Sequence, residues 1–212
     1  MEDSERVQRI IALLTKEHSD AKVALHHDNP LELLVATVLS AQATDKQVNK
    51  VTEALFKKYR TPEDYAKADP RELEEDIRST GFYRSKAKYL KKTGQMLVEE
   101  FNSKVPQTME ELTVLPGVAR KTANIVLSNA FGVTEGIAVD THVRRLAQRL
   151  GLSKNKNPDK MERDLMELVP KRQWAKLTDL LIFHGRRVCT AKKPSCKGCV
   201  INELCPSAFT FD

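Results

Sequence analysis

The sequence lacks the features that would mark a membrane, secreted or β-sheet protein. Its most apolar stretch, residues 31–41, is too short to span a bilayer. The N-terminus is acidic, and no apolar run follows it that could serve as a signal peptide. The alternation of apolar and polar residues that is typical of strands is absent. We therefore expect a soluble, intracellular protein that is built from helices and does not contact a membrane.

Acidic residues are outnumbered by basic ones. The 212 residues include 35 Lys and Arg against 29 Asp and Glu, which gives a net charge of +6. Such an excess is compatible with a polyanionic partner but does not require one. Hydrophobic residues make up 41% of the chain, which is enough for a sizeable core and excludes a disordered protein. The length suits one large domain or two small lobes.

Helix signals recur along the whole chain. Val7, Ile10 and Leu14 repeat at the spacing of one helix face, and residues 31–41 predict a buried helix. Further helix starts are predicted at Asn29-Pro30, Thr44 with Gln47, Thr61 with Asp64, Asp69 with Glu72, Thr108 with Glu111, and Asn157-Pro158. About ten helices with short connections predict an all-α fold.

The first motif with chemical content is Leu115-Pro116-Gly117-Val118-Ala119-Arg120-Lys121. Pro ends one helix and Gly permits a tight hairpin before the next one. Successive backbone N–H groups at that second helix start can bind a phosphate, although spacing alone favours an ordinary turn. Lys121 lies in the first helical turn, where the helix dipole and Arg120 favour a neutral, nucleophilic amine. A solvated surface lysine is the alternative.

The second motif contains a single acidic residue. Asp140, within Val139-Asp140-Thr141-His142-Val143, precedes a predicted amphipathic helix. It is therefore expected to cap that helix, and a capping carboxylate also suits an electrostatic role. His142 is interpreted as a packed or surface residue.

The third motif is the cysteine set, which is confined to the C-terminal part of the chain. Cys189, Cys196, Cys199 and Cys205 have the spacing C-x6-C-x2-C-x5-C. Four thiolates so close in sequence can surround one metal centre, and a reducing compartment argues against disulfides. Spacing alone leaves zinc and a [4Fe–4S] cluster open. Residues 185–197, which are predicted to form a loop, carry five cations and no acid, which is typical of a phosphate clamp.

Taken together, these motifs resemble the endonuclease III family of helix-hairpin-helix DNA glycosylases. The resemblance covers nearly the whole chain. It runs through Ser40-Ala41-Gln42-Ala43-Thr44-Asp45, Gly81-Phe82-Tyr83, the hairpin from Leu115, the segment from Val139 and the four cysteines in order. Each motif is modest alone, but their order and spacing are specific.

The resemblance implies an all-α fold of two helical lobes with a DNA cleft between them. Residues 22–133 would form a helical barrel domain that contains the helix-hairpin-helix. Residues 1–21 with 134–212 would form an iron–sulfur domain, with a [4Fe–4S] cluster on the four cysteines. Lys121 matches the family's catalytic lysine and Asp140 its catalytic aspartate.

The family is a bifunctional DNA glycosylase and AP lyase of base excision repair. It removes oxidised pyrimidines by base flipping, Schiff-base formation at C1′ and β-elimination. Gln42 and Phe82 match positions that fill the gap left by the flipped base. The remaining expected DNA contacts are Pro116, Gly117, Val118, Ala119, Arg186, Lys192 and Lys193.

Three departures and two alternatives accompany this resemblance. Ala119 stands where a second hairpin glycine is frequent, and Phe82 stands where Leu is common. The interval from Lys121 to Asp140 is slightly longer than in common members of the family. One alternative is a mismatch glycosylase of the same superfamily, acting on uracil, thymine or adenine; Lys121 argues against the adenine type. The other is a non-catalytic DNA-binding cluster protein. We expect a cytoplasmic, nucleoid-associated monomer whose partner is double-stranded DNA with damaged pyrimidines or abasic sites.

Overall fold

The computed structural model describes residues 3–210, and helices account for all of the regular structure in that range. Eleven α-helices and four short 3₁₀-helices follow one another, with no strand among the described residues. The predicted all-α fold is confirmed. The chain divides into two compact units, one of residues 24–135 and one that joins the residues before 24 to those after 135.

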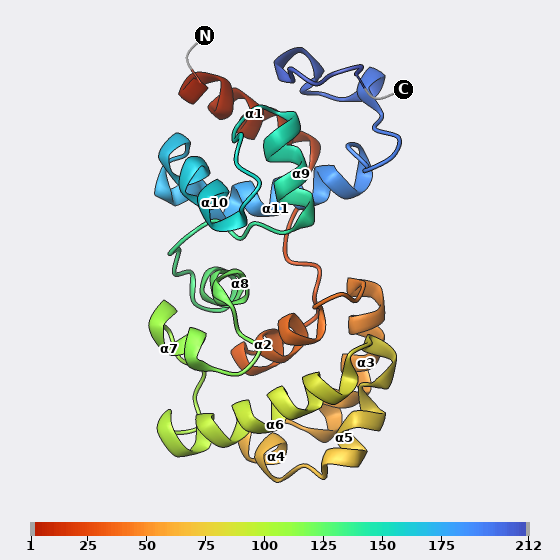
Figure 1. Cartoon of the computed structure of the whole chain (residues 1–212), viewed down its shortest axis with the longest axis vertical. Helices are drawn as coiled ribbons and strands as arrows, with labels where there is room; N and C mark the ends of the chain where they lie inside the picture. The colour runs from red at the N-terminus through yellow and green to blue at the C-terminus, as the bar shows by residue number, and fades with distance from the viewer. Residues whose placement is uncertain (1–2, 211–212) are drawn as a thin grey trace. The chain divides into compact units, whose positions relative to one another are not determined.

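The unit of residues 24–135 is built around a buried helix. Its helices are α2 (Pro30–Leu39), α3 (Asp45–Lys58), α4 (Pro62–Lys67), α5 (Pro70–Asp76), η1 (Arg78–Thr80), α6 (Tyr83–Glu100), α7 (Met109–Val114) and α8 (Arg120–Phe131). Helix α2 is buried along almost its whole length and contacts α3, α6 and α8 (Figure 1). Gly94 lets α6 approach α4 closely, because a Cβ there would lie 2.7 Å from the Ala66 nitrogen.

The predicted helix starts are present, with one difference in detail. Side chains accept backbone N–H groups at Asn29, Thr44, Thr61, Asp69, Thr108 and Asn157. These bonds satisfy donors that a helix start would leave unpaired. At α3, however, the Gln47 amide does not complete a reciprocal capping box. It donates instead to the Ser79 hydroxyl at 2.6 Å, which ties α3 to η1.

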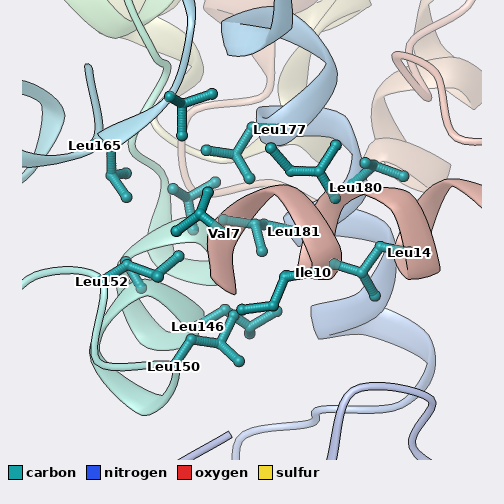
Figure 2. Packing of buried hydrophobic residues seen from close by; sticks show 14 of the residues in the cluster. Val7, Ile10, Leu14, Leu146, Leu150, Leu152, Leu165, Leu177, Leu180 and Leu181 are labelled. Atoms are coloured by element: carbon teal, nitrogen blue, oxygen red, sulfur yellow. The ribbon is translucent and has the colours of Figure 1, made fainter. Parts of the chain in front are cut away.

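The other unit joins the beginning of the chain to its C-terminal part. Its elements are α1 (Asp3–Glu17), α9 (Thr141–Arg149), α10 (Pro158–Leu168), η2 (Lys171–Gln173), α11 (Trp174–Arg187), η3 (Cys196–Gly198) and η4 (Asn202–Leu204). Figure 2 shows the predicted apolar face of α1, with Val7, Ile10 and Leu14 packed among leucines of the later helices. All three side chains are fully buried, which holds α1 against the rest of this unit.

None of the helices within residues 3–210 is both long and apolar enough to cross a membrane.

Candidate functional site

The hairpin between α7 and α8 has the backbone that the sequence predicts. Helix α7 ends at Val114, and the Val118 N–H donates to the Leu115 carbonyl at 3.1 Å to close the turn. Gly117 has φ +79°, in the left-handed region that favours glycine. A Cβ at this position would also lie 2.8 Å from the Tyr89 ring of α6. Glycine is therefore required here both by its conformation and by the close contact with Tyr89.

Ala119 and Val118 complete the hairpin. The Ala119 backbone is extended, at φ −87° and ψ 169°, so this position imposes no need for a second glycine. Ala119 is the N-cap residue of α8 and has no side-chain acceptor for the N–H groups that follow. Val118 is buried and anchors the turn, whereas Gly117 and Ala119 are exposed. The hairpin thus presents backbone rather than side chains to its surroundings.

The structure places Lys121 and Asp140 in different units. Lys121 is the second residue of α8 and is exposed, within the first turn that the sequence predicts. Asp140 is the N-cap residue of α9, and its Oδ1 accepts the Val143 N–H at 2.8 Å. The predicted capping role is therefore confirmed. Asp140 is half-buried.

Gln42 and Phe82 both adopt a left-handed backbone, which is uncommon for residues other than glycine. Gln42 has φ 56° in the turn after α2, and Phe82 has φ 48° in the turn before α6. Both residues are exposed, and the Phe82 side chain is a large apolar group at 65% exposure. Nothing in their local sequence signals this conformation.

All four cysteines line one cavity in the C-terminal unit. Their thiols are free and half-buried, and the walls between them include Leu146, Pro194 and Ile201. Burial raises the pKa of the Cys199 and Cys205 thiols, and the neighbouring cysteines raise it further. A metal centre would offset this crowding, because its positive charge favours the thiolate forms.

The four thiols are candidate ligands of a metal centre. Within residues 3–210, no three side chains of His, Cys, Asp or Glu are placed to hold a single metal ion. A structural zinc site needs four ligands around one ion, whereas an iron–sulfur cluster receives each thiolate at a different iron. The four cysteines share a cavity, and their thiolates suit either kind of centre by ligand type.

Sequence reasoning missed two residues that contact the sulfurs, Arg149 as a donor and His184 as a donor or acceptor according to its tautomer. Arg149 donates to the Cys189 Sγ at 3.2 Å and to the Thr190 carbonyl at 2.7 Å. His184 Nε2 lies 3.4 Å from the Cys199 Sγ. Such donors orient thiolates and lower the cost of their charge. Arg145 lies one turn earlier on α9 and donates to the Cys189 carbonyl at 3.1 Å. Residues four apart share a helix face, so the pair Arg145 and Arg149 was the sequence signal for two cations that face the same segment.

A second histidine supports His184. His18 Nε2 lies 3.1 Å from His184 Nδ1, and both rings are buried. Burial, reinforced by the neighbouring His18, lowers the pKa of His184 to about 4. The ring is therefore neutral near pH 7, with one nitrogen that donates and one that accepts. If Nδ1 accepts from His18, the Nε2–H of His184 can donate to the sulfur.

The predicted basic segment differs from expectation at its start. Helix α11 continues through Arg187, so Arg186 lies in the last helical turn rather than in a loop. Cations are favoured there by the helix dipole. Arg187 is engaged with Asp20, to which it donates twice, at 2.9 and 2.7 Å. Lys192 and Lys193 are exposed in the segment between Cys189 and Cys196.

Comparison with known proteins identifies the family of the chain. Residues 35–171 match the family model described as the HhH-GPD superfamily base excision DNA repair protein. Endonuclease III of Synechocystis sp. is 52% identical over 204 residues, which is 96% of this chain and 93% of that protein. The chain belongs to the endonuclease III family.

Solved structures agree with this assignment. A non-covalent endonuclease III–DNA complex superposes with a TM-score of 0.94 at 45% identity, covering 99% of this chain and 98% of that one. A trapped endonuclease III–DNA covalent intermediate gives the same TM-score and identity, with 99% of each chain covered. The family resemblance that the sequence motifs indicate is therefore confirmed.

Proposed function

We propose that this chain is a bifunctional DNA glycosylase and AP lyase of base excision repair that removes oxidised pyrimidines. The observation that carries the proposal is an exposed lysine, Lys121, in the first turn of the helix that follows the hairpin. A primary amine in this place suits a family in which a covalent endonuclease III–DNA intermediate has been trapped.

Lys121 is proposed to act as the nucleophile in this reaction. The neutral Lys121 amine attacks C1′ of the flipped nucleotide, and the bond to the base breaks with its electron pair leaving on the base. The sugar ring of the resulting adduct then opens: the C1′–O4′ bond breaks, O4′ takes up a proton, and the C1′–nitrogen bond becomes a protonated imine, which acidifies the C2′ proton. Removal of that proton expels the 3′ phosphate, so the strand is cut on the 3′ side.

Asp140 supplies the negative charge that the first step needs. Breaking the glycosidic bond builds positive charge on the sugar, and a fixed carboxylate stabilises that charge in the transition state. The backbone N–H of Val143 fixes one oxygen of Asp140 at 2.8 Å, which orients the other. The carboxylate is thereby pre-oriented before the substrate binds.

The experiment that tests the function is incubation with defined duplexes. Duplexes that carry thymine glycol, a uracil mismatch or an abasic site are compared, and the products are resolved as free base and cut strand. Release of the oxidised base with a 3′ cut supports the proposal. Excision of uracil without strand cleavage would instead support the mismatch glycosylase, and binding without any product would support a non-catalytic protein.

The four cysteines are proposed to hold a [4Fe–4S] cluster, which organises the C-terminal segment rather than taking part in base removal. The cavity that they share and the donors at Arg149 and His184 support this assignment. Purified protein is expected to be yellow-brown and to contain about four irons per chain. Stoichiometric zinc without iron in anaerobically prepared protein would contradict the prediction. Cys196→Ser is expected to lose the cluster, the fold of the C-terminal unit and DNA affinity together.

The hairpin Pro116–Ala119 and the cations Arg186, Lys192 and Lys193 are proposed to contact DNA phosphates irrespective of sequence. The exposed hairpin positions Gly117 and Ala119 and the exposed cations suit that role. The protein would act as a monomer on double-stranded DNA in the cytoplasm, in association with the nucleoid.

A single cation can be tested through the salt dependence of binding. Lys192→Ala is expected to reduce the slope of log affinity against log salt concentration by about one for undamaged duplex, since one phosphate contact is lost. Fluorescence anisotropy at several salt concentrations measures this slope. Lys160→Ala on α10 removes the same charge far from the segment in sequence and should leave the slope unchanged. Equal slopes for Lys192→Ala and the unaltered protein would show that Lys192 does not touch phosphate.

A further inference from the structure

A buried lysine connects the two turns that carry Gln42 and Phe82. The Lys86 ammonium of α6 donates to the Leu39 carbonyl at 2.8 Å and to the Thr80 carbonyl at 2.8 Å. Leu39 is the last residue of α2, three positions before Gln42, and Thr80 is the last residue of η1, two positions before Phe82. One side chain therefore bridges segments that lie some 40 residues apart in the sequence.

The bridge is electrostatically specific. Leu39 ends α2 and Thr80 ends the short η1, and the last carbonyl groups of a helix have no partner within it. A cation that donates to both carbonyls satisfies them at the same time. Lys86 is only 3% exposed, and burial lowers the pKa of its ammonium group. A charge in such a place is retained only where its hydrogen bonds offset the loss of hydration.

The turns themselves need support. Gln42 and Phe82 both have a left-handed backbone conformation, which residues with a Cβ rarely adopt. In addition, the Phe82 side chain makes no capping hydrogen bond at the start of α6. Such conformations persist only when surrounding contacts fix them. The Lys86 backbone N–H also donates to the Phe82 carbonyl at 3.1 Å, so the same residue holds the Phe82 turn twice. At the surface, the Gln47 amide of α3 donates to the Ser79 hydroxyl of η1, which links the segment after Gln42 to the segment before Phe82.

We propose that Lys86 is a positioning residue that sets the separation and orientation of Gln42 and Phe82, so that both side chains enter the gap in the DNA stack together. This inference rests on the proposed function, in which these two residues replace the flipped nucleotide. Lys86 touches neither the DNA nor the reacting atoms. Its effect reaches the substrate through the two turns alone.

The consequence is a difference between substrates. Removing a damaged base from a paired duplex requires unpairing and unstacking, which the two side chains must offset. A preformed abasic site needs less of this help, because no base remains to be extruded. Loss of the bridge is therefore expected to slow base excision more than it slows strand cleavage at an abasic site.

The test compares Lys86→Met, which keeps an apolar stem of similar length but removes the charge and the donors, with Lys92→Met, an exposed lysine on the same helix. Single-turnover excision of thymine glycol by Lys86→Met should fall by about tenfold or more, and abasic-site cleavage by no more than about threefold. Fluorescence of 2-aminopurine placed opposite the lesion should rise less on binding. Lys92→Met should match the unaltered protein in all three measurements. If Lys86→Met does not fold, Lys86→Gln is used with the same expectations, because its shorter amide cannot reach both carbonyls.

A double-mutant comparison separates positioning from general stability. In a chain that already carries Gln42→Ala and Phe82→Ala, Lys86→Met should add less than about a twofold loss of excision, because nothing is left to position. An additional tenfold loss in that background, or an equal loss on both substrates, would overturn the inference. If the unaltered protein releases no oxidised base, the proposed function fails; if it does and Lys86→Met behaves identically, only the role of Lys86 fails.

Discussion

Lys121→Ala should abolish both strand cleavage and the covalent adduct that borohydride traps on abasic-site DNA. The amine is the atom that forms the imine, so the loss should be on the order of 10³-fold or more rather than partial. Lys121 is exposed on the first turn of α8, and its removal should change the free energy of unfolding by less than about 0.5 kcal/mol. Denaturing gel electrophoresis of the trapped adduct measures the effect.

The loss of cleavage can be assigned to the chemical step only if Lys121→Ala still binds DNA. Affinity of Lys121→Ala for abasic-site DNA should stay within a few-fold of the unaltered protein, because the hairpin and the other cations remain. Lys57→Ala removes an exposed lysine of α3 in the same unit and should give a full yield of adduct. A full adduct yield from Lys121→Ala itself would assign the nucleophile to another amine, such as the N-terminus.

Asp140→Asn should slow release of an oxidised base by about 10²- to 10³-fold, which is typical of removing one electrostatic stabiliser from a transition state. Strand cleavage at a preformed abasic site should fall much less, because no glycosidic bond remains to break. Single-turnover assays on the two substrates measure the difference. Equal losses on both substrates would contradict a role for Asp140 in base release.

The choice of asparagine separates the two roles of this residue. Asp140 caps α9 through the Val143 N–H, and asparagine caps a helix about as well as aspartate. The Tm of Asp140→Asn should therefore stay close to that of the unaltered protein. Asp140→Ala removes the cap as well and should destabilise by about 1 kcal/mol. Asp69→Asn, at the start of α5, repeats the same exchange away from the proposed chemistry and should leave activity unchanged.

Local signals predicted most of the helix boundaries, because the groups that start a helix are close together in sequence. Asn29 and Asp140 cap the helices that directly follow them, and Gly117 takes the positive φ that the hairpin needs. Val7 and Ile10 are buried as their spacing indicates. In each case a side chain interacts with backbone or neighbours within one or two turns, and such interactions can be read from sequence.

The features that the sequence did not predict depend on contacts between segments that are distant in the chain. Gln47 was expected to complete a capping box at its own helix, but Ser79 offers a competing acceptor 32 positions away. The left-handed backbone of Phe82 is held by Lys86, whose partners include Leu39, and no short-range pattern contains that information. His184 meets His18, 166 positions away, only because α1 and α11 pack together. The proposed pairing of Lys121 with Asp140 likewise comes from the family likeness.

The packing of α1 against α11 has a consequence for biosynthesis. Helix α1 is synthesised well before α11, because residues 24–135 lie between them in the chain. Residues 24–135 contain their own core and can fold while translation continues. The apolar face of α1, with Ile10 and Leu14, must meanwhile remain without its partners. Chaperone binding to nascent chains should therefore concentrate on α1, and release should follow synthesis of α11.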